Sequence, residues 1–231
     1  MRPLRVSCRL ADGCFASTDG LLMLDAILAA EWMRRNHPDQ YYNDGAKGEY
    51  IEPQLPLAEV DVAGHRIYRA SAAQYLKRGE YIHYWHKRLD EGIVEKHIDR
   101  PRKVDTKAGH YKGYRMPLVV QLAGPMLYWF CRGDLAGVAD LLGGVKALGK
   151  KRSQGFGMVG LDTAGRPGWT VEEWLEDWGI YGPDGRLMRP VPVGNEIPEG
   201  ARVMRWGIRP PFWLHNNKAL CRMPEVGDWD G

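Results

Sequence analysis

Apolar and polar side chains alternate at the start of the chain. The apolar members of this run are Leu4, Val6, Cys8 and Leu10. A repeat of two residues is typical of a strand with one buried face. From Leu21 to Met33 apolar residues recur at helical spacing instead, which predicts a helix that Thr18 or Asp19 caps. Because no second carboxylate is tied to Asp25 by spacing, we expect Asp25 to lie on the helix surface or to cap it.

The next part of the chain has less regular patterning. Between Asn36 and Pro56, three prolines and many small polar residues predict a long loop. Residues 57–62 and 66–72 flank Ala63-Gly64, an arrangement that predicts a hairpin. One more extended segment is expected at residues 81–85.

Regular elements resume after Met116. The expected elements up to Leu161 are an apolar strand at 117–122, a short helix at 134–142 and a strand at 156–161. Those after Gly165 are a helix at 171–178 capped by Thr170 and strands at 186–191 and 203–208. The chain is thus predicted to be α+β, with a core at 1–163 and a small β-rich appendage at 164–231. A long insertion, from about residue 36 to about residue 115, interrupts the core.

Composition narrows the class of protein only slightly. The chain has 231 residues, is 44% hydrophobic and carries a net charge of +3, so gross charge barely favours a polyanionic partner. Its four cysteines lie far apart without a CxxC pair, which argues against a zinc ribbon and a dense disulfide framework. Acidic residues interrupt the first apolar stretch, so it suits neither a signal peptide nor a membrane span. We expect a cytoplasmic protein with no cofactor, no metal and no membrane partner.

A glycine-bracketed basic loop at residues 143–157 is the segment most suggestive of function. Its five glycines allow the backbone to approach a ligand closely, and its cations and amides suit the phosphate oxygens of a nucleic acid. The candidate binding residues here are Gly144, Lys146, Gly149, Lys150, Lys151, Arg152, Ser153, Gln154, Gly155, Phe156 and Gly157. Ser153 and Gln154 suit phosphate or ribose, and Phe156 either anchors the loop to the core or stacks on a base.

Two other interpretations of this loop remain open. Residues 144–150 satisfy most of the nucleotide-binding pattern GxxxxGK[ST]. However, Lys151 stands where a hydroxyl would hold magnesium, and the loop follows a helix and leads into a strand, which reverses the required order. Alternatively, the loop is a solvated turn whose lysines protect an edge strand.

A second basic stretch runs from Lys96 to Arg115, with only Asp99 and Asp105 as acids. The candidate binding residues in it are Arg100, Arg102, Lys103, Lys107, Lys112 and Arg115. A local basic excess of this kind fits a nucleic-acid contact or a solvated hairpin equally well.

The loop also carries a family resemblance. A basic loop followed by Gly-Phe-Gly, entering the last strand of a βαββαβ unit, resembles the glycine-rich signature loop of the RAMP superfamily, the RNA-binding subunits of CRISPR effector complexes. Within that superfamily the chain is similar to the type IV (Csf) subunit of the Cas five-like kind. The segments that carry this similarity are LDAILA at 24–29, the loop at 141–157 and LMRPVP at 187–192.

This resemblance implies a fold and a role. The fold is a ferredoxin-like (RRM-like) core whose insertion is thumb-like, and the role is to hold the repeat-derived 5′ end of a CRISPR RNA without catalysis. The implied partners are the CRISPR RNA, the Cas seven-like backbone subunits and the large subunit, with target DNA reached through the complex.

Two different classes of function remain as alternatives. Some members of the superfamily cut CRISPR RNA, and the candidate general bases here are His83, His86, His97 and His110. His83 and His86 would share one face of a helix but point to opposite faces of a strand, and no third metal ligand accompanies them.

The other class is a purely structural interaction protein. Trp169, Trp174 and Trp178 form either an apolar face for a partner or part of the core. Residues 209–213 are expected to be a polyproline-like strand on the surface of the protein.

Overall fold

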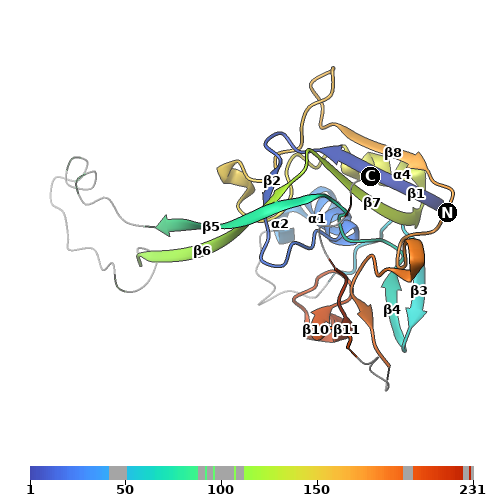
Figure 1. Ribbon diagram of the computed structural model, residues 1–231. Helices are drawn as coiled ribbons and strands as arrows, with labels where there is room; N and C mark the ends of the chain where they lie inside the picture. Colours follow the sequence, from blue (N-terminus) through green and yellow to red (C-terminus); the bar gives the residue numbers. More distant parts are fainter. Residues whose placement is uncertain are drawn as a thin grey trace.

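The computed structural model describes residues 1–41, 51–87, 92, 96, 107, 112–194, 200–225 and 229. They form a mixed α+β protein with several small antiparallel sheets, in agreement with the predicted class (Figure 1). The helices are α1 (Leu24–Asn36), α2 (Pro38–Tyr41) and α4 (Leu135–Leu142), with 3-10 turns η2 (Arg152–Gln154), η3 (Pro183–Gly185) and η4 (His215–Asn217). The strands are β1 (Arg2–Arg9), β2 (Cys14–Ala16), β3 (Glu59–Val62), β4 (His65–Tyr68), β5 (Lys77–Lys87), β6 (Tyr114–Ala123), β7 (Met126–Gly133), β8 (Trp169–Glu173), β9 (Val191–Pro192), β10 (Val203–Gly207) and β11 (Lys218–Arg222).

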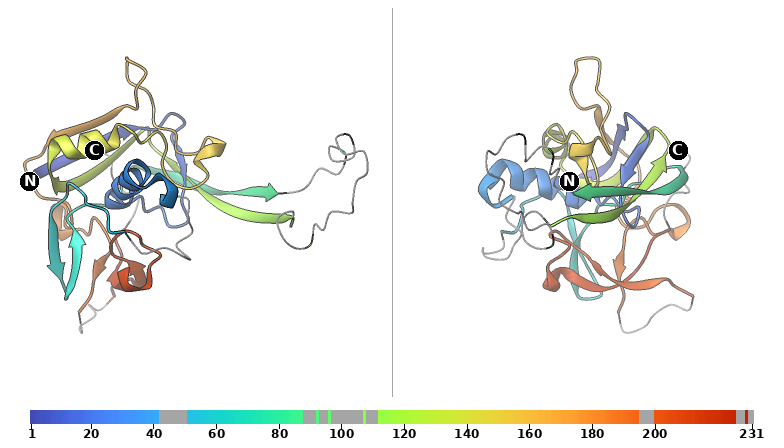
Figure 2. Two further views of the ribbon diagram at one scale, coloured as in Figure 1. Left: turned by 180° about the vertical axis from the view of Figure 1, so that it is seen from behind. Right: turned by 90° about the vertical axis from the view of Figure 1, so that its left-hand side faces the viewer.

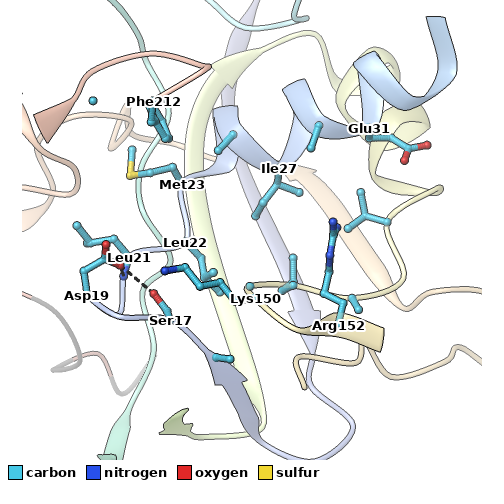
Figure 3. A pocket seen from close by; sticks show the side chains of 18 of the residues that line it. Ser17, Asp19, Leu21, Leu22, Met23, Ile27, Glu31, Lys150, Arg152 and Phe212 are labelled. Atoms are coloured by element: carbon cyan, nitrogen blue, oxygen red, sulfur yellow. Dashed lines mark hydrogen bonds between the residues drawn. The ribbon is translucent and has the colours of Figure 1, made fainter. Parts of the chain in front are cut away.

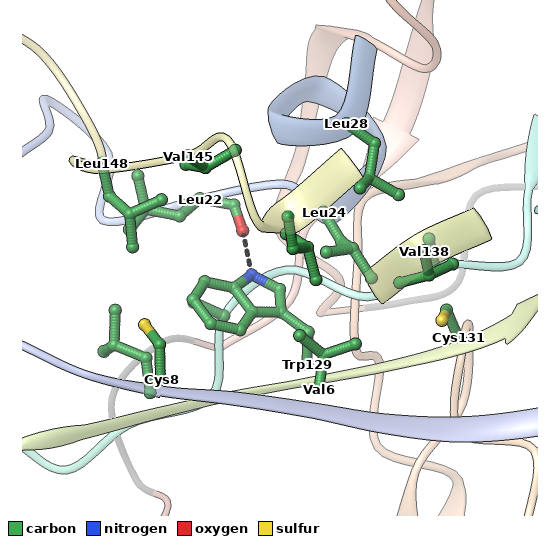
Figure 4. Close-up of a cluster of buried hydrophobic side chains, with 14 of the residues drawn as sticks. Val6, Cys8, Leu22, Leu24, Leu28, Trp129, Cys131, Val138, Val145 and Leu148 are labelled. Carbon is green, nitrogen blue, oxygen red and sulfur yellow. Dashed lines mark hydrogen bonds between the residues drawn. The ribbon is translucent and has the colours of Figure 1, made fainter. Parts of the chain in front are cut away.

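The central sheet has the antiparallel strand order β7-β1-β8. Because β1 is the middle strand, the apolar face predicted from its alternation is fully buried: Leu4, Val6 and Cys8 are at most 1% exposed. Side chains of α1 and α4 join the same hydrophobic core (Figure 4). Trp129 of β7 lies within this core, and its Nε1 donates to the carbonyl oxygen of Leu22 at 2.8 Å. The predicted first strand and the helix at 134–142 are therefore confirmed.

Aromatic side chains gather on the opposite face of the central sheet. Phe130 of β7 contacts Trp174, Trp178 and Trp229, with ring centroids 4.9 to 5.8 Å apart. On the core face, by contrast, Trp169 packs against Trp129, with centroids 5.5 Å apart. Of the two interpretations of the tryptophans, packing within the protein is the one that these contacts support.

Two predicted elements are wrong. The helix predicted at 171–178 does not form: residues 171–173 belong to strand β8, in which Val171 pairs with Val6 of β1, and residues 174–178 are irregular. The pairing with β1 prevails over the helical spacing. The predicted strand at 156–161 forms only isolated bridges, such as that between Val159 and Leu10. Gly157 has a φ of +69°, which interrupts an extended backbone there.

The first helix also begins differently from the prediction. α1 begins at Leu24, after Met23 as an N-cap that has no side-chain hydrogen bond. Ser17 and Asp19 close the preceding turn instead: Ser17 Oγ donates to Asp19 Oδ1 at 2.8 Å, and the Leu21 amide donates to the same oxygen at 2.9 Å. Neither Thr18 nor Asp19 therefore caps the helix.

Strands β5 and β6 form a two-stranded arm that extends away from the body of the protein (Figures 1 and 2). β2 pairs with the other edge of β6 and so connects the arm to the body. The extended segment predicted at 81–85 and the strand predicted at 117–122 are confirmed, and both are longer than predicted. Of the loop predicted between Asn36 and Pro56, residues 42–50 lie outside the described residues, and α2 occupies its beginning.

A second, smaller sheet has the order β10-β11-β9 and shares a hydrophobic cluster with the β3-β4 hairpin. The predicted hairpin and the strand predicted at 203–208 are confirmed. Of the strand predicted at 186–191, only Val191 belongs to a strand. Residues 209–213 form bends and a turn rather than a polyproline-like strand.

A buried ion pair connects this second region to α1. The expectation that Asp25 lies on the helix surface or caps it is wrong: its side chain has no solvent exposure, and its Oδ2 lies 3.1 Å from Nη2 of Arg189. The fully buried Arg189 also donates to the carbonyl oxygens of Tyr68, Ala70 and Ile208. Such a charge needs several partners because it has lost its hydration. The predicted division near residue 163 stays a prediction.

Candidate nucleic-acid interface

The glycine-bracketed loop begins where α4 ends. Asp134 caps α4 by accepting from the Gly137 amide at 2.8 Å, and Gly143 follows the helix at its other end. A Cβ on Gly144 would lie 1.9 Å from Oε1 of Glu31 in α1. A side chain at position 144 would therefore displace the Glu31 carboxylate, because α1 packs against the loop there.

Two further glycines of the loop are required because a Cβ on either of them would clash with backbone atoms of a neighbouring segment. Gly149 has a φ of +75°, and a Cβ there would lie 2.5 Å from the carbonyl oxygen of Ala16. Gly157 has a φ of +69°, and its Cβ would lie 2.1 Å from the carbonyl oxygen of Leu148. The sequence suggested that these glycines allow close approach to a ligand, whereas here they allow close approach to the protein's own backbone. Gly155 differs from them: its φ is +91°, and nothing lies within 4 Å of a Cβ built on it.

Hydrogen bonds hold the loop against β2. The Lys150 amide donates to the carbonyl oxygen of Ala16 at 2.8 Å, and the Gly157 amide donates to that of Cys14 at 3.1 Å. The Gly155 amide donates to the carbonyl oxygen of Arg152 at 3.1 Å. A ligand at this loop would therefore not meet the amides of these three residues in the observed conformation.

The exposed tip of the loop is the short turn η2. Arg152, Ser153 and Gln154 are exposed, and they lie between Lys151 and Gly155, both of which have left-handed backbone conformations. The tip thus presents one cation and two neutral hydrogen-bonding side chains to solvent.

Side chains at both ends of this tip contact one face of the arm. Lys151 Nζ lies 3.4 Å from the ring centroid of Trp85, a cation–π contact. Phe156 is partly buried against Leu118 and Val120, and its ring contacts that of His83 with centroids 5.4 Å apart. These contacts give Phe156 an anchoring position, which is one of the two roles that the sequence suggested.

The loop forms one wall of a cleft of about 1230 Å³. α1 and the turn before it line the floor, with Met23 and Ile27 among the apolar residues there (Figure 3). Lys150 and Arg152 lie on the loop side of the view, and Phe212 lies at the other end. The second wall comes from β10, β11 and the turn between them.

Basic side chains outnumber carboxylates around this cleft. The basic lining residues are Arg34, Lys146, Lys150, Arg152, Arg205 and Lys218, and the acidic ones are Asp19 and Glu31. Glu31 is only 4% exposed and forms ion pairs with Arg34 at 2.6 Å and Arg35 at 2.7 Å. Burial raises the pKa of Glu31, but hydrogen bonds from the two arginines outweigh that effect and hold the pKa below its ordinary value. Since its carboxylate is neutralised locally, the cleft is electropositive overall.

A comparison with known protein families identifies the family of the whole chain. A family model described as CRISPR type IV associated protein Csf3 matches residues 2–224. The chain belongs to the Csf3 family. Csf3 is the Cas5-like subunit of the type IV CRISPR system, so the family resemblance carried by the loop and the two shorter segments is confirmed. No curated protein matches the chain.

Within this Csf3-family chain, the second predicted basic stretch falls largely outside the structure. Arg100, Arg102 and Lys103 lie outside the described residues, whereas Lys107 and Lys112 are exposed. The Arg115 guanidinium lies 3.6 Å from the ring centroid of Tyr84, on the arm. None of the described members of this stretch lines the cleft.

The histidines that the structure describes do not form a recognisable catalytic or metal site in this Csf3-family chain. His83 and His86 lie three residues apart in β5 and therefore point to opposite faces of the arm. His97 and His110 lie outside the described residues. Among the residues that the structure describes, no three His, Cys, Asp or Glu side chains are grouped as a metal site would require, and no helix is long and apolar enough to cross a membrane.

Several residues of the cleft were not found from the sequence. They are Arg34, Arg205, Phe212, Trp213 and Lys218. Arg34 was not singled out because basic residues are common in the last turn of a helix. The other four belong to β10, β11 or the turn between them, which lie beside the loop only in the folded protein. No local pattern marks them as neighbours of residues 143–157.

Proposed function

We propose that this subunit holds the repeat-derived 5′ segment of a CRISPR RNA in the cleft beside the glycine-bracketed loop, without cutting it. The observation that carries the proposal is the gathering of six cations around one cleft that has two carboxylates; the buried one, Glu31, pairs with Arg34 of that set and with Arg35 outside it. A polyanion gains from such a surface through phosphate contacts and counterion release.

The arrangement of the loop adds chemical detail to this proposal. In the observed conformation phosphates would meet chiefly the exposed side chains of Lys146, Lys150 and Arg152, because several loop amides donate within the protein. Ser153 and Gln154 at the tip supply neutral partners suited to phosphate or to a ribose 2′-hydroxyl. Open space beside Gly155 leaves room for a sugar-phosphate backbone there.

We interpret the central part of the protein as a ferredoxin-like core. β1, α1, a segment near residues 70–74, β7, α4 and β8 follow one another in the order βαββαβ. The segment near 70–74 bridges to β7 through Ala70 with Cys131 and Gln74 with Tyr128, which extends the β7-β1-β8 sheet at the β7 edge. Membership of the Csf3 family supports this interpretation, and it supports assembly with Cas seven-like backbone subunits and a large subunit. Within this proposal β8 belongs to the core, so the appendage begins after Glu173 rather than at residue 164, and the β5-β6 arm is the thumb-like part.

The experiment compares RNA binding by the wild-type chain and a Lys146→Ala, Lys150→Ala, Arg152→Ala variant. Affinity for a single-stranded repeat RNA is measured by fluorescence anisotropy between about 50 and 200 mM salt. Loss of three phosphate contacts should weaken binding and reduce the slope of log affinity against log salt by about 2. A matched variant, Arg2→Ala, Arg66→Ala, Arg166→Ala, removes three exposed cations that do not line the cleft, and it should bind as the wild type does. Equal affinity of the loop variant and the wild type at low salt would remove the loop from the RNA site.

The ribonuclease alternative gains no support from the described residues. It requires a positioned base and a partner group near one RNA backbone, whereas His83 and His86 point to opposite faces of the arm. The proposal predicts that the purified chain leaves a repeat RNA intact, with or without added metal ions. Cleavage that His83→Ala or His86→Ala slows without loss of binding would establish the nuclease instead.

A further inference from the structure

The wall of the cleft opposite the loop carries an exposed indole. Trp213 is 60% exposed, more than any other aromatic side chain in the described part of the chain. It lies in the turn between β10 and β11, and both Trp213 and its neighbour Phe212 line the cleft. Because so much of the ring is in solvent, core packing explains little of its presence there.

The turn that carries Trp213 is held firmly by its surroundings. The Leu214 amide donates to the carbonyl oxygen of Pro211 at 3.1 Å, and buried Asn217 donates through Nδ2 to the carbonyl oxygen of Pro210 at 3.0 Å. A Cβ on Gly207 would lie 2.5 Å from Cβ of Phe212, so β10 and the turn are in close contact. The indole is therefore presented from an ordered support, which lowers the entropy lost when a ligand packs against it.

Charges on this wall favour the same kind of ligand as the loop does. Arg205 of β10 and Lys218 of β11 line this wall, whereas Lys150 and Arg152 belong to the loop that forms the other wall. A ligand in the cleft thus meets cations on two sides and an aromatic ring on one of them. Unpaired nucleic acid has this combination of anionic backbone and flat bases, whereas a duplex keeps its bases stacked on each other.

We propose that the Trp213 ring stacks on one unpaired base of the RNA whose phosphates contact the loop cations. This inference rests on the proposed function, because it assumes that the RNA occupies the cleft. Stacking on an indole tolerates any base, so Trp213 adds affinity for unpaired RNA without selecting its sequence. The base that reaches the ring is set by where the cleft holds the 5′ end of the strand. A protein partner that uses Trp213 as an anchor is the competing occupant, and the cation excess argues against it unless that partner is acidic.

The test combines substitutions at Trp213 with removal of single bases from the RNA. The probes are fluorescein-labelled single-stranded repeat RNAs of about ten nucleotides, each with an abasic residue at a different position. Wild-type protein should lose affinity at one abasic position in particular. Trp213→Ala should bind the intact RNA about 5- to 150-fold more weakly, the range for one base-aromatic stack, and should show no further loss at that abasic position. Trp213→Phe should retain most of the affinity.

Two controls separate stacking from other effects. Trp213→Leu keeps a branched apolar side chain but no ring, so it should behave as Trp213→Ala does even if alanine perturbs the turn. The salt slope of Trp213→Ala should equal that of the wild type because no cation is removed, unlike the slope of the loop variant.

The outcomes distinguish this inference from the proposed function. If the wild type binds RNA and the loop variant does not, but Trp213→Ala binds with unchanged affinity, then stacking is overturned and the RNA cleft stands. Failure of Trp213→Ala to join the effector complex would then assign Trp213 to a protein contact. If the wild-type chain binds no repeat RNA at any salt concentration, both proposals are overturned together.

Discussion

Asp25 in α1 and Arg189 in the C-terminal region form an ion pair of 3.1 Å in which neither side chain has any solvent exposure. The two residues belong to the two short segments, 24–29 and 187–192, that resembled the family apart from the loop. Burial raises the pKa of Asp25, and the charge and hydrogen bond of Arg189 oppose that effect. The Arg189 charge is compensated by Asp25 and by three buried carbonyl oxygens, so this contact ties the second sheet to the first core.

Removal of one member of this pair should strongly destabilise the protein. We expect Asp25→Ala to lower the free energy of unfolding by about 3–5 kcal/mol because it leaves the Arg189 guanidinium buried without a counterion. Asp140→Ala breaks the Arg35 pair, in which Asp140 is 74% exposed, and should cost no more than about 1 kcal/mol. Urea denaturation measures both values. A double variant, Asp25→Ala with Arg189→Met, should recover part of the loss, and equal stability of the two single variants would contradict the expectation.

Glycine substitutions should separate the packed part of the loop from its open tip. Gly157→Ala combines a positive φ with a clash against the Leu148 backbone, so we expect a loss of stability of about 3 kcal/mol or more. Gly155→Ala meets no neighbour and should cost only the strain of its left-handed backbone, about 1–2 kcal/mol. Thermal unfolding of the two variants provides the comparison. A smaller effect at Gly157 than at Gly155 would show that the loop does not pack against Leu148.

The loss of folding stability at low pH should depend on Glu31. Its pKa in the folded protein lies below the ordinary value of 4.5, so the folded state binds fewer protons than the unfolded state as pH falls. The stabilisation is therefore present above about pH 4.5 and is lost as pH falls through the lower, folded-state pKa. Glu31→Gln should be less stable than the wild type at neutral pH, and the difference should shrink in acid. Urea denaturation at several pH values measures it, and a constant difference would contradict the assignment.

The cysteines should differ in reactivity according to burial. Burial raises the pKa of Cys131 to about 12 and that of Cys221 to about 11, and it also raises the pKa of Cys8. Cys14 is partly exposed, and its pKa is raised by burial and by Asp12. Since thiolates react and buried thiols do not, Ellman's reagent at about pH 8 should modify Cys14 slowly and the other three only after unfolding. Rapid modification of more than one thiol in the native protein would contradict this.

Parts of the fold were accessible from sequence because local pattern and tertiary structure agree there. The alternation in residues 4–10 identified β1 correctly, since the middle strand of a sheet buries a complete face. Asp134 and the apolar residues after it identified α4 because a side-chain cap is a local signal. Residues 171–178 were assigned wrongly to a helix because their apolar spacing suits one, and only the pairing with β1 shows that 171–173 are a strand.

The site was accessible in part for a related reason. The loop cations were found because they are contiguous in the chain, whereas Trp213 and Lys218 join them only through docking of the second sheet. The partner of Asp25 lies 164 residues away, so local spacing left that residue as an ordinary surface carboxylate. The glycines were recognised as important, but the reason for three of them is contact with α1, Ala16 and Leu148.

The contacts between the loop tip and the arm have a mechanical consequence. Lys151 lies over Trp85 and Phe156 lies against His83, two residues on the same face of β5. If a bound partner bends the arm at this point, these contacts couple the movement of the arm to that of the loop tip. The position of the Arg152 guanidinium in the cleft would then depend on the angle between the arm and the body of the protein.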